Sequence, residues 1–66
     1  MKFKIEISCD NDAFAENGLT EVGRILSKVA DSMNNYLSGP IESSTFFERL
    51  YDYNGNKVGL ALLEAE

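Results

Sequence analysis

Histidine and tryptophan are absent from this chain of 66 residues, and it has one cysteine and one proline. Without histidine the chain lacks the commonest general base and the commonest metal ligand, so we expect no enzyme activity, no metal and no cofactor. A single cysteine cannot form a disulfide within the chain, whereas small secreted domains normally have several. No apolar run approaches the roughly 18 residues that a membrane span needs. These absences predict a non-catalytic protein of the cytoplasm.

Basic residues are also scarce, since 6 Lys and Arg stand against 11 Asp and Glu, for a formal net charge of −5. Hydrophobic residues make up 44% of the chain, which is typical of a folded domain rather than of a disordered segment. A chain this short buries only about 60% of its unfolded surface, which leaves little room for both a core and a deep catalytic cleft. We therefore expect residues 1–66 to form one small acidic domain that acts through its surface.

The N-terminal segment alternates polar and apolar residues over positions 2–8. That period is typical of a strand with one buried face, here the face of Phe3, Ile5 and Ile7. Residues 9–12 are rich in Asp and Asn, which end a strand because their side chains bond to nearby backbone groups. Phe14 follows in an irregular turn and is expected to lie under the next element.

A helix is predicted over residues 18–37, where apolar residues recur at steps of three and four. Asn17 suits the N-cap position, and Ser38-Gly39-Pro40 is a stop signal. Gly23 lies inside this helix, where glycine costs about 1 kcal/mol relative to alanine. We therefore expect Gly23 to mark a close approach of the helix to the sheet.

A β-hairpin is predicted over residues 44–64, around a turn at 52–56. A two-residue turn at Asn54-Gly55 would bury Arg49 in the middle of a strand. A type I turn followed by a left-handed Gly55 separates apolar from charged residues better, so we adopt that register. It places Phe46, Leu50, Val58, Leu60 and Leu62 on the inner face, and Phe47, Arg49, Tyr51, Lys57, Gly59, Ala61 and Leu63 on the outer face.

Together these elements predict an α+β fold of β-α-β-β type, with one helix packed on one face of a three-stranded antiparallel sheet. A right-handed crossover allows the first strand to lie beside the last, which gives the strand order 1-3-2. The order 1-2-3 is the alternative. The expected core comprises Phe3, Ile5, Ile7, Leu19, Val22, Ile25, Leu26, Val29, Met33, Phe46, Leu50, Val58, Leu60 and Leu62.

The acidic segment after the first strand has part of the spacing of a calcium-binding loop. Asp10, Asp12 and Glu21 match its first, third and twelfth positions. The fifth position is Phe14, which has no side-chain oxygen, and the sixth is Ala15, where a glycine is required. We therefore expect no calcium site. Cys9 has no histidine to activate it, so we expect it to be a small buried residue and not a nucleophile.

The first candidate for partner binding is an acidic rim, whose members are Asp10, Asp12, Glu16 and Glu21, with Glu42 as a secondary member. A concentrated negative field attracts a basic partner and raises the association rate. Such a surface can act as a DNA mimic and occupy a groove that binds nucleic acid. The other explanation of these charges is solubility alone.

The second candidate is the outer face of the sheet, which is expected to carry Phe47, Arg49, Tyr51 and Lys57 beside Lys2 and Lys4. An open face with aromatic and basic side chains can stack single-stranded bases. An exposed apolar patch can equally contact a second copy or another protein. The net charge of −5 opposes nucleic acid, because affinity there depends on neutralising phosphates.

Three segments resemble a group of very small phage and prophage proteins. They are Ile5-Glu6-Ile7 with Asn11-Asp12-Ala13-Phe14, the helix segment Glu21-Val22-Gly23-Arg24-Ile25-Leu26 with Val29-Ala30-Asp31, and the hairpin Leu50-Tyr51-Asp52-Tyr53-Asn54-Gly55-Asn56-Lys57-Val58-Gly59. The departures from the pattern are Gly23, where alanine is preferred, and a longer connection over residues 38–45.

The resemblance implies a context and a mode of action. Small acidic proteins of phages and mobile elements often inhibit host defences directed at nucleic acid, anti-CRISPR proteins among them, by covering a basic surface without chemistry. Combined with the acidic rim, it predicts an inhibitor in the bacterial cytoplasm that binds a basic surface of a nucleic-acid-handling protein or complex. The alternative is a homodimeric or single-stranded nucleic-acid-binding module that uses the sheet face.

Overall fold

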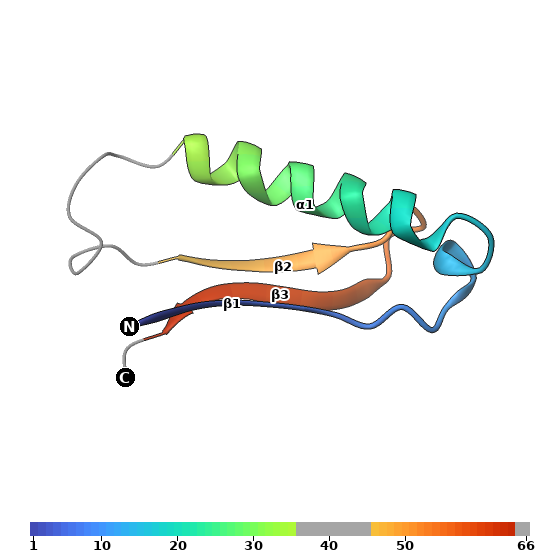
Figure 1. The fold of residues 1–66 in the computed structure, drawn as a ribbon, viewed down its shortest axis with the longest axis horizontal. Helices are drawn as coiled ribbons and strands as arrows, with labels where there is room; N and C mark the ends of the chain where they lie inside the picture. The colour runs from blue at the N-terminus through green and yellow to red at the C-terminus, as the bar shows by residue number, and fades with distance from the viewer. Residues whose placement is uncertain (36–45, 65–66) are drawn as a thin grey trace.

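A computed structural model describes residues 1–35 and 46–64 of the chain, and these form a β-α-β-β arrangement (Figure 1). In chain order the elements are β1 (Lys2–Ile7), a short 3-10 helix η1 (Asp12–Phe14), α1 (Gly18–Asn34), β2 (Phe47–Tyr51) and β3 (Lys57–Glu64). The predicted fold class and helix start are confirmed. The helix ends earlier than expected, since its last residue is Asn34 and Asn35 is its C-cap, whereas the prediction ran to residue 37. Residues 36–37, the stop signal at 38–40 and Glu42 lie outside the described residues.

The three strands form one sheet in the order β1-β3-β2, and β3 runs antiparallel to both neighbours. This confirms the preferred strand order. Helix α1 lies along one face of the sheet and contacts β2, and within the described ranges no element covers the opposite face (Figure 1). The sheet therefore has an inner face toward α1 and an outer face on the other side.

The turn between β2 and β3 has the predicted chemistry. The backbone N–H of Gly55 donates to the carbonyl of Asp52 over 3.0 Å, and the N–H of Asp52 donates to the carbonyl of Asn56 over 2.9 Å. Gly55 has φ of 85°, the left-handed conformation that glycine adopts without strain. A type I turn followed by a left-handed glycine is thus confirmed.

The predicted faces of β3 are wrong beyond Val58, because the ladder contains a second irregularity. Leu50 pairs with Gly59 whereas Tyr51 pairs with Lys57, so Val58 is an extra residue on β3. A β-bulge of this kind inverts the side-chain alternation that follows it. The inner face of β3 therefore carries Gly59, Ala61 and Leu63, and the outer face carries Leu60 and Leu62.

Two backbone contacts explain why the chain accepts this bulge. The N–H of Ser8 donates to the carbonyl of Val58 over 2.8 Å, which ties the bulge to the end of β1. A Cβ added to Gly59 would overlap the backbone oxygen of Glu6, so only glycine fits at this position. Strand β1 thus sets the register of β3 through features that the hairpin sequence does not contain.

The buried apolar core is smaller than expected and contains residues of η1, α1, β2 and β3, together with Phe46 just before β2. Its members are Ala13, Phe14, Ile25, Val29, Phe46, Leu50, Val58 and Ala61, with Ile7, Val22 and Leu63 packed against it. Five expected core positions are instead exposed: Phe3, Ile5, Leu19, Leu26 and Met33. The helix buries the stripe of Glu21, Ile25 and Val29, which leaves Leu19 89% exposed.

Two smaller expectations also fail. Gly23 is exposed, and nothing lies within 4 Å of a Cβ built on it, so it marks no close approach to the sheet. Cys9 is exposed rather than buried. Asn17 occupies the N-cap position as predicted, but its side chain makes no capping bond.

Candidate functional site

Polar residues from three separate segments meet where η1, α1 and the hairpin turn come together. We call Asn11, Glu21, Arg24 and Asp52 the polar junction. Asn11 is its link between the first loop and the hairpin. Its Oδ1 accepts from the N–H of Ala13 over 3.0 Å, which caps η1, and its Nδ2 donates to Oδ2 of Asp52 over 2.7 Å. The loop after β1 is thereby fixed to the β2–β3 turn.

Asp52 organises the hairpin turn from inside, with only 4% of its surface exposed. Its Oδ1 accepts from the backbone N–H groups of Asn54 and Asn56, each over 2.9 Å, and its Oδ2 accepts from Nδ2 of Asn56 over 3.3 Å. Burial acts to raise the pKa of Asp52, but the bonds from Asn56, Asn11 and Asn54 outweigh it and lower that pKa. Asp52 is therefore a charged acceptor that holds the turn.

Glu21 is likewise internal, with 5% of its surface exposed. Arg24 donates to it through two bonds, from Nε to Oε1 over 2.7 Å and from Nη2 to Oε2 over 2.8 Å. The N–H of Tyr53 also donates to Oε2 over 2.8 Å. The Arg24 bonds, opposed by burial and aided by the bond from Tyr53, lower the pKa of Glu21. Glu21 thus joins α1 to the hairpin and contributes no free carboxylate to the acidic rim.

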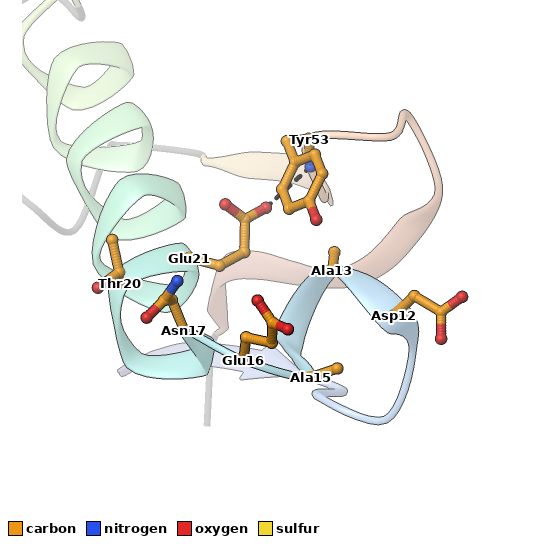
Figure 2. Close-up of a pocket in the computed structure, with 8 residues that line it drawn as sticks. All are labelled: Asp12, Ala13, Ala15, Glu16, Asn17, Thr20, Glu21 and Tyr53. Atoms are coloured by element: carbon orange, nitrogen blue, oxygen red, sulfur yellow. Dashed lines mark hydrogen bonds between the residues drawn. The ribbon is translucent and has the colours of Figure 1, made fainter.

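An open pocket of about 430 Å³ lies beside the polar junction. Figure 2 shows the Glu16 side chain directed toward the space between Glu21 and Tyr53, while the Asp12 carboxylate points outward. Asp10 is exposed in the preceding loop and does not line the pocket. The lining residues are Asp12, Ala13, Ala15, Glu16, Asn17, Thr20, Glu21 and Tyr53. Three members of the acidic rim thus surround one concave surface.

The outer face of the sheet carries the other candidate residues. Phe47 and Tyr51 are 54% and 47% exposed, and the Arg49 guanidinium lies 5.6 Å from the centre of the Phe47 ring. Lys57 pairs with Tyr51 at the end of the ladder. Because of the bulge, Leu60 and Leu62 take the place of the expected Gly59, Ala61 and Leu63 on this face.

Sequence reasoning missed the polar junction although signals for it were present. Glu21 and Arg24 are three residues apart on a helix, a spacing at which side chains meet. Asp52 precedes Asn54 by two residues, as in turns where an Asp side chain accepts from the backbone. Within residues 1–35 and 46–64, no group of three or more acidic or cysteine side chains is arranged to hold a metal ion. No helix in these ranges is long and apolar enough to cross a membrane.

Comparisons of the chain with protein-family models, with curated proteins and with solved structures find no match. They identify no family, so the resemblance to small phage proteins stays an expectation; the segments on which it was based contain Asn11, Glu21, Arg24 and Asp52, the residues of the polar junction. In this structure those residues hold the fold together. The class that the fold defines is a small α+β domain of β-α-β-β type.

Proposed function

We propose that this protein is a non-catalytic interaction protein that binds a basic surface of another protein through its η1 end. The observation that carries the proposal is the open pocket with Glu16 and Tyr53 on its walls. Within the part of the chain that the structure describes, Asp10, Asp12 and Glu16 form no ion pair. Their negative charge is therefore available to a partner.

A lysine or arginine side chain has the chemistry to enter this pocket. Its charge would pair with the Glu16 carboxylate, and its cationic group would lie against the exposed Tyr53 ring. One exposed ion pair contributes only about 0–1 kcal/mol, so affinity must come from several contacts together. Asp12 also lines the pocket and Asp10 is exposed two residues earlier, so both add negative charge at this end of the molecule, which favours fast association with a basic partner.

We further propose that the partner is a nucleic-acid-handling complex of a bacterial host defence, inhibited in the manner of an anti-CRISPR protein. Two observations support this extension, the resemblance to small phage proteins and the net charge of −5. Surfaces that bind nucleic acid are rich in Lys and Arg. Binding of this protein and binding of nucleic acid would then exclude each other on the same partner.

The test compares two triple variants with the same change in net charge. The first reverses Asp10, Asp12 and Glu16 to Lys, and the control reverses Asp31, Glu48 and Glu64, which lie on the helix and the sheet and do not line the pocket. Immobilised protein captures partners from bacterial lysate, and each captured protein is titrated with both variants at low and high salt. We expect only the first variant to lose binding. Equal affinity of wild type and first variant at both salt concentrations would contradict the proposal.

A further inference from the structure

The outer face of the sheet has a regular arrangement of charge around a central apolar strand. Pairing across the three strands gives two adjacent rows, Lys4–Leu62–Phe47 and Glu6–Leu60–Arg49. Each row has a leucine on β3, with a β1 residue on one side and a β2 residue on the other. We call these six residues the outer patch. Among the elements that the structure describes, none covers it (Figure 1).

The row of Glu6, Leu60 and Arg49 has opposite charges at its two ends. Neighbouring strands lie about 4.8 Å apart, so about 10 Å separates the Glu6 and Arg49 positions and Leu60 stands between them. Among the described residues, no ion pair joins Glu6 to Arg49. A two-fold axis that runs along β3, between two facing sheets, would place Glu6 opposite the Arg49 of a second copy.

We propose that a second copy of this chain packs on the outer patch, sheet against sheet, about a two-fold axis along β3. The same axis sets Leu60 against the partner's Leu60 and Leu62 against the partner's Leu62. It also sets Lys4 against the partner's Phe47, a cation over an aromatic ring. Aligned sheets pack about 10 Å apart with interdigitating side chains. Self-complementarity of this kind is what a two-fold interface requires.

The area and composition of the face favour a second copy over a nucleic acid. A typical stable interface buries about 800 Å² on each partner, which is about a sixth of the 4939 Å² that the chain exposes. An interface of that size would need the whole outer face, from Lys2 and Glu64 at one end to Tyr51 and Lys57 at the other. Glu6 and Glu64 lie among the basic residues of this face and make its charge mixed, and the net charge of −5 opposes binding to phosphates.

The first experiment measures the mass of the purified chain by sedimentation velocity from micromolar to millimolar concentration. We expect a dimer, twice the monomer mass of 7.3 kDa. Leu60→Glu should raise the dimer dissociation constant at least about 30-fold, as expected for a central interface residue. Leu19→Glu adds the same charge at an exposed helix position and should leave the mass unchanged. A monomer at millimolar concentration would overturn the proposal.

A charge exchange tests the axis and does not depend on the leucine variant folding. Glu6→Arg alone and Arg49→Glu alone should each weaken the dimer, because like charges then face each other. The double variant Glu6→Arg with Arg49→Glu should restore it. Failure of this restoration would overturn the assigned axis.

The competing hypothesis, that the outer face binds nucleic acid, is tested with a single-stranded oligonucleotide. If a monomeric protein binds it, and Tyr51→Ala or Arg49→Glu abolishes that binding, the face recognises nucleic acid and the dimer is excluded. The Asp10, Asp12 and Glu16 reversal should still dimerise, since those residues lie outside the outer patch. Failure of the dimer and failure of the proposed function are thereby distinguished.

Discussion

The polar junction and the outer patch use the same residue types in opposite ways. In the junction, Glu21 and Arg24 lie on one helix turn and meet through two hydrogen bonds of 2.7 and 2.8 Å. In the patch, Glu6 and Arg49 lie on the two edge strands with Leu60 between them. Glu21 and Arg24 are paired within the chain and hold the hairpin, whereas Glu6 and Arg49 form no ion pair with each other among the described residues and would each face a second copy in the dimer proposed above. Burial and pairing, rather than residue type, separate structural charges from those available for binding.

The largest loss of stability should follow from adding a side chain at Gly59, where the backbone of β1 lies closest to β3. Gly59→Ala places a Cβ against the Glu6 backbone oxygen, and neither backbone can move without disrupting the β1–β3 ladder. We expect a loss of unfolding free energy at the upper end of the ~1–3 kcal/mol seen for overpacking. Urea unfolding followed by circular dichroism measures it.

Gly23→Ala is the matched control for that substitution. Its Cβ meets nothing within 4 Å, and its site is inside α1. Alanine should therefore stabilise the protein by about 0.5–1 kcal/mol. Similar unfolding free energies for the two variants would show that the close approach of the β1 backbone does not exclude a side chain at position 59.

The register shows where sequence reasoning succeeded and where it stopped. The alternation in residues 2–8 and the turn at 52–56 depend on neighbouring residues in the sequence. The first strand and the turn could therefore be predicted. The bulge at Val58 depends on β1, which lies far away in the sequence. Residues 58–63 could not reveal it, because apolar side chains occupy both alternations there. One extra residue therefore moved Leu60 and Leu62 to the outer face.

The candidate site was predicted less well than the fold, for a related reason. Glu21 was assigned to the acidic rim because a charged residue is normally exposed. The structure buries it, since Arg24 and the N–H of Tyr53 supply the bonds that a buried carboxylate needs. Asp10, Asp12 and Glu16 stayed exposed because no such donors reach them. The sequence shows which residues are charged. Whether a charged side chain is buried and paired or stays exposed depends on the donors that the fold brings close to it.

An intermediate loss of stability is expected at acid pH, where the Glu21 and Asp52 carboxylates of the polar junction become protonated. The pKa of Glu21 lies below its ordinary value of 4.5, and the pKa of Asp52 lies below its ordinary value of 3.8. A group with a lowered pKa stabilises the folded state at pH above its unfolded value, and that contribution is lost as the pH falls through the folded value. The urea midpoint should therefore be level near neutral pH and fall below about pH 4.5.

A double variant isolates the source of that fall. Glu21→Gln with Asp52→Asn removes both titrating groups of the junction, so its urea midpoint should be lower at neutral pH and nearly independent of pH below it. Replacing the exposed Asp10 and Asp12 by Asn should leave the wild-type profile in place. If the junction variant kept the full acid dependence, the two buried carboxylates would not be its origin.

The smallest effect should come from an ion pair on the outer face. Lys4 Nζ lies 3.4 Å from Glu64 Oε1, and the two side chains are 57% and 44% exposed. Water and salt screen such a pair, and ordering two long side chains has an entropic cost, so exposed pairs contribute about 0.2–1 kcal/mol. A double-mutant cycle with Lys4→Ala and Glu64→Ala, measured by urea unfolding, should give a coupling energy within that range. This coupling energy should be smaller in high salt.

The same cycle on Glu21 and Arg24 should give a larger and less salt-sensitive coupling energy, because two hydrogen bonds join that pair and its carboxylate is buried. Equal coupling energies for the two pairs would contradict the distinction between buried and exposed ion pairs. The exposure of a pair would then not determine how much it stabilises the fold.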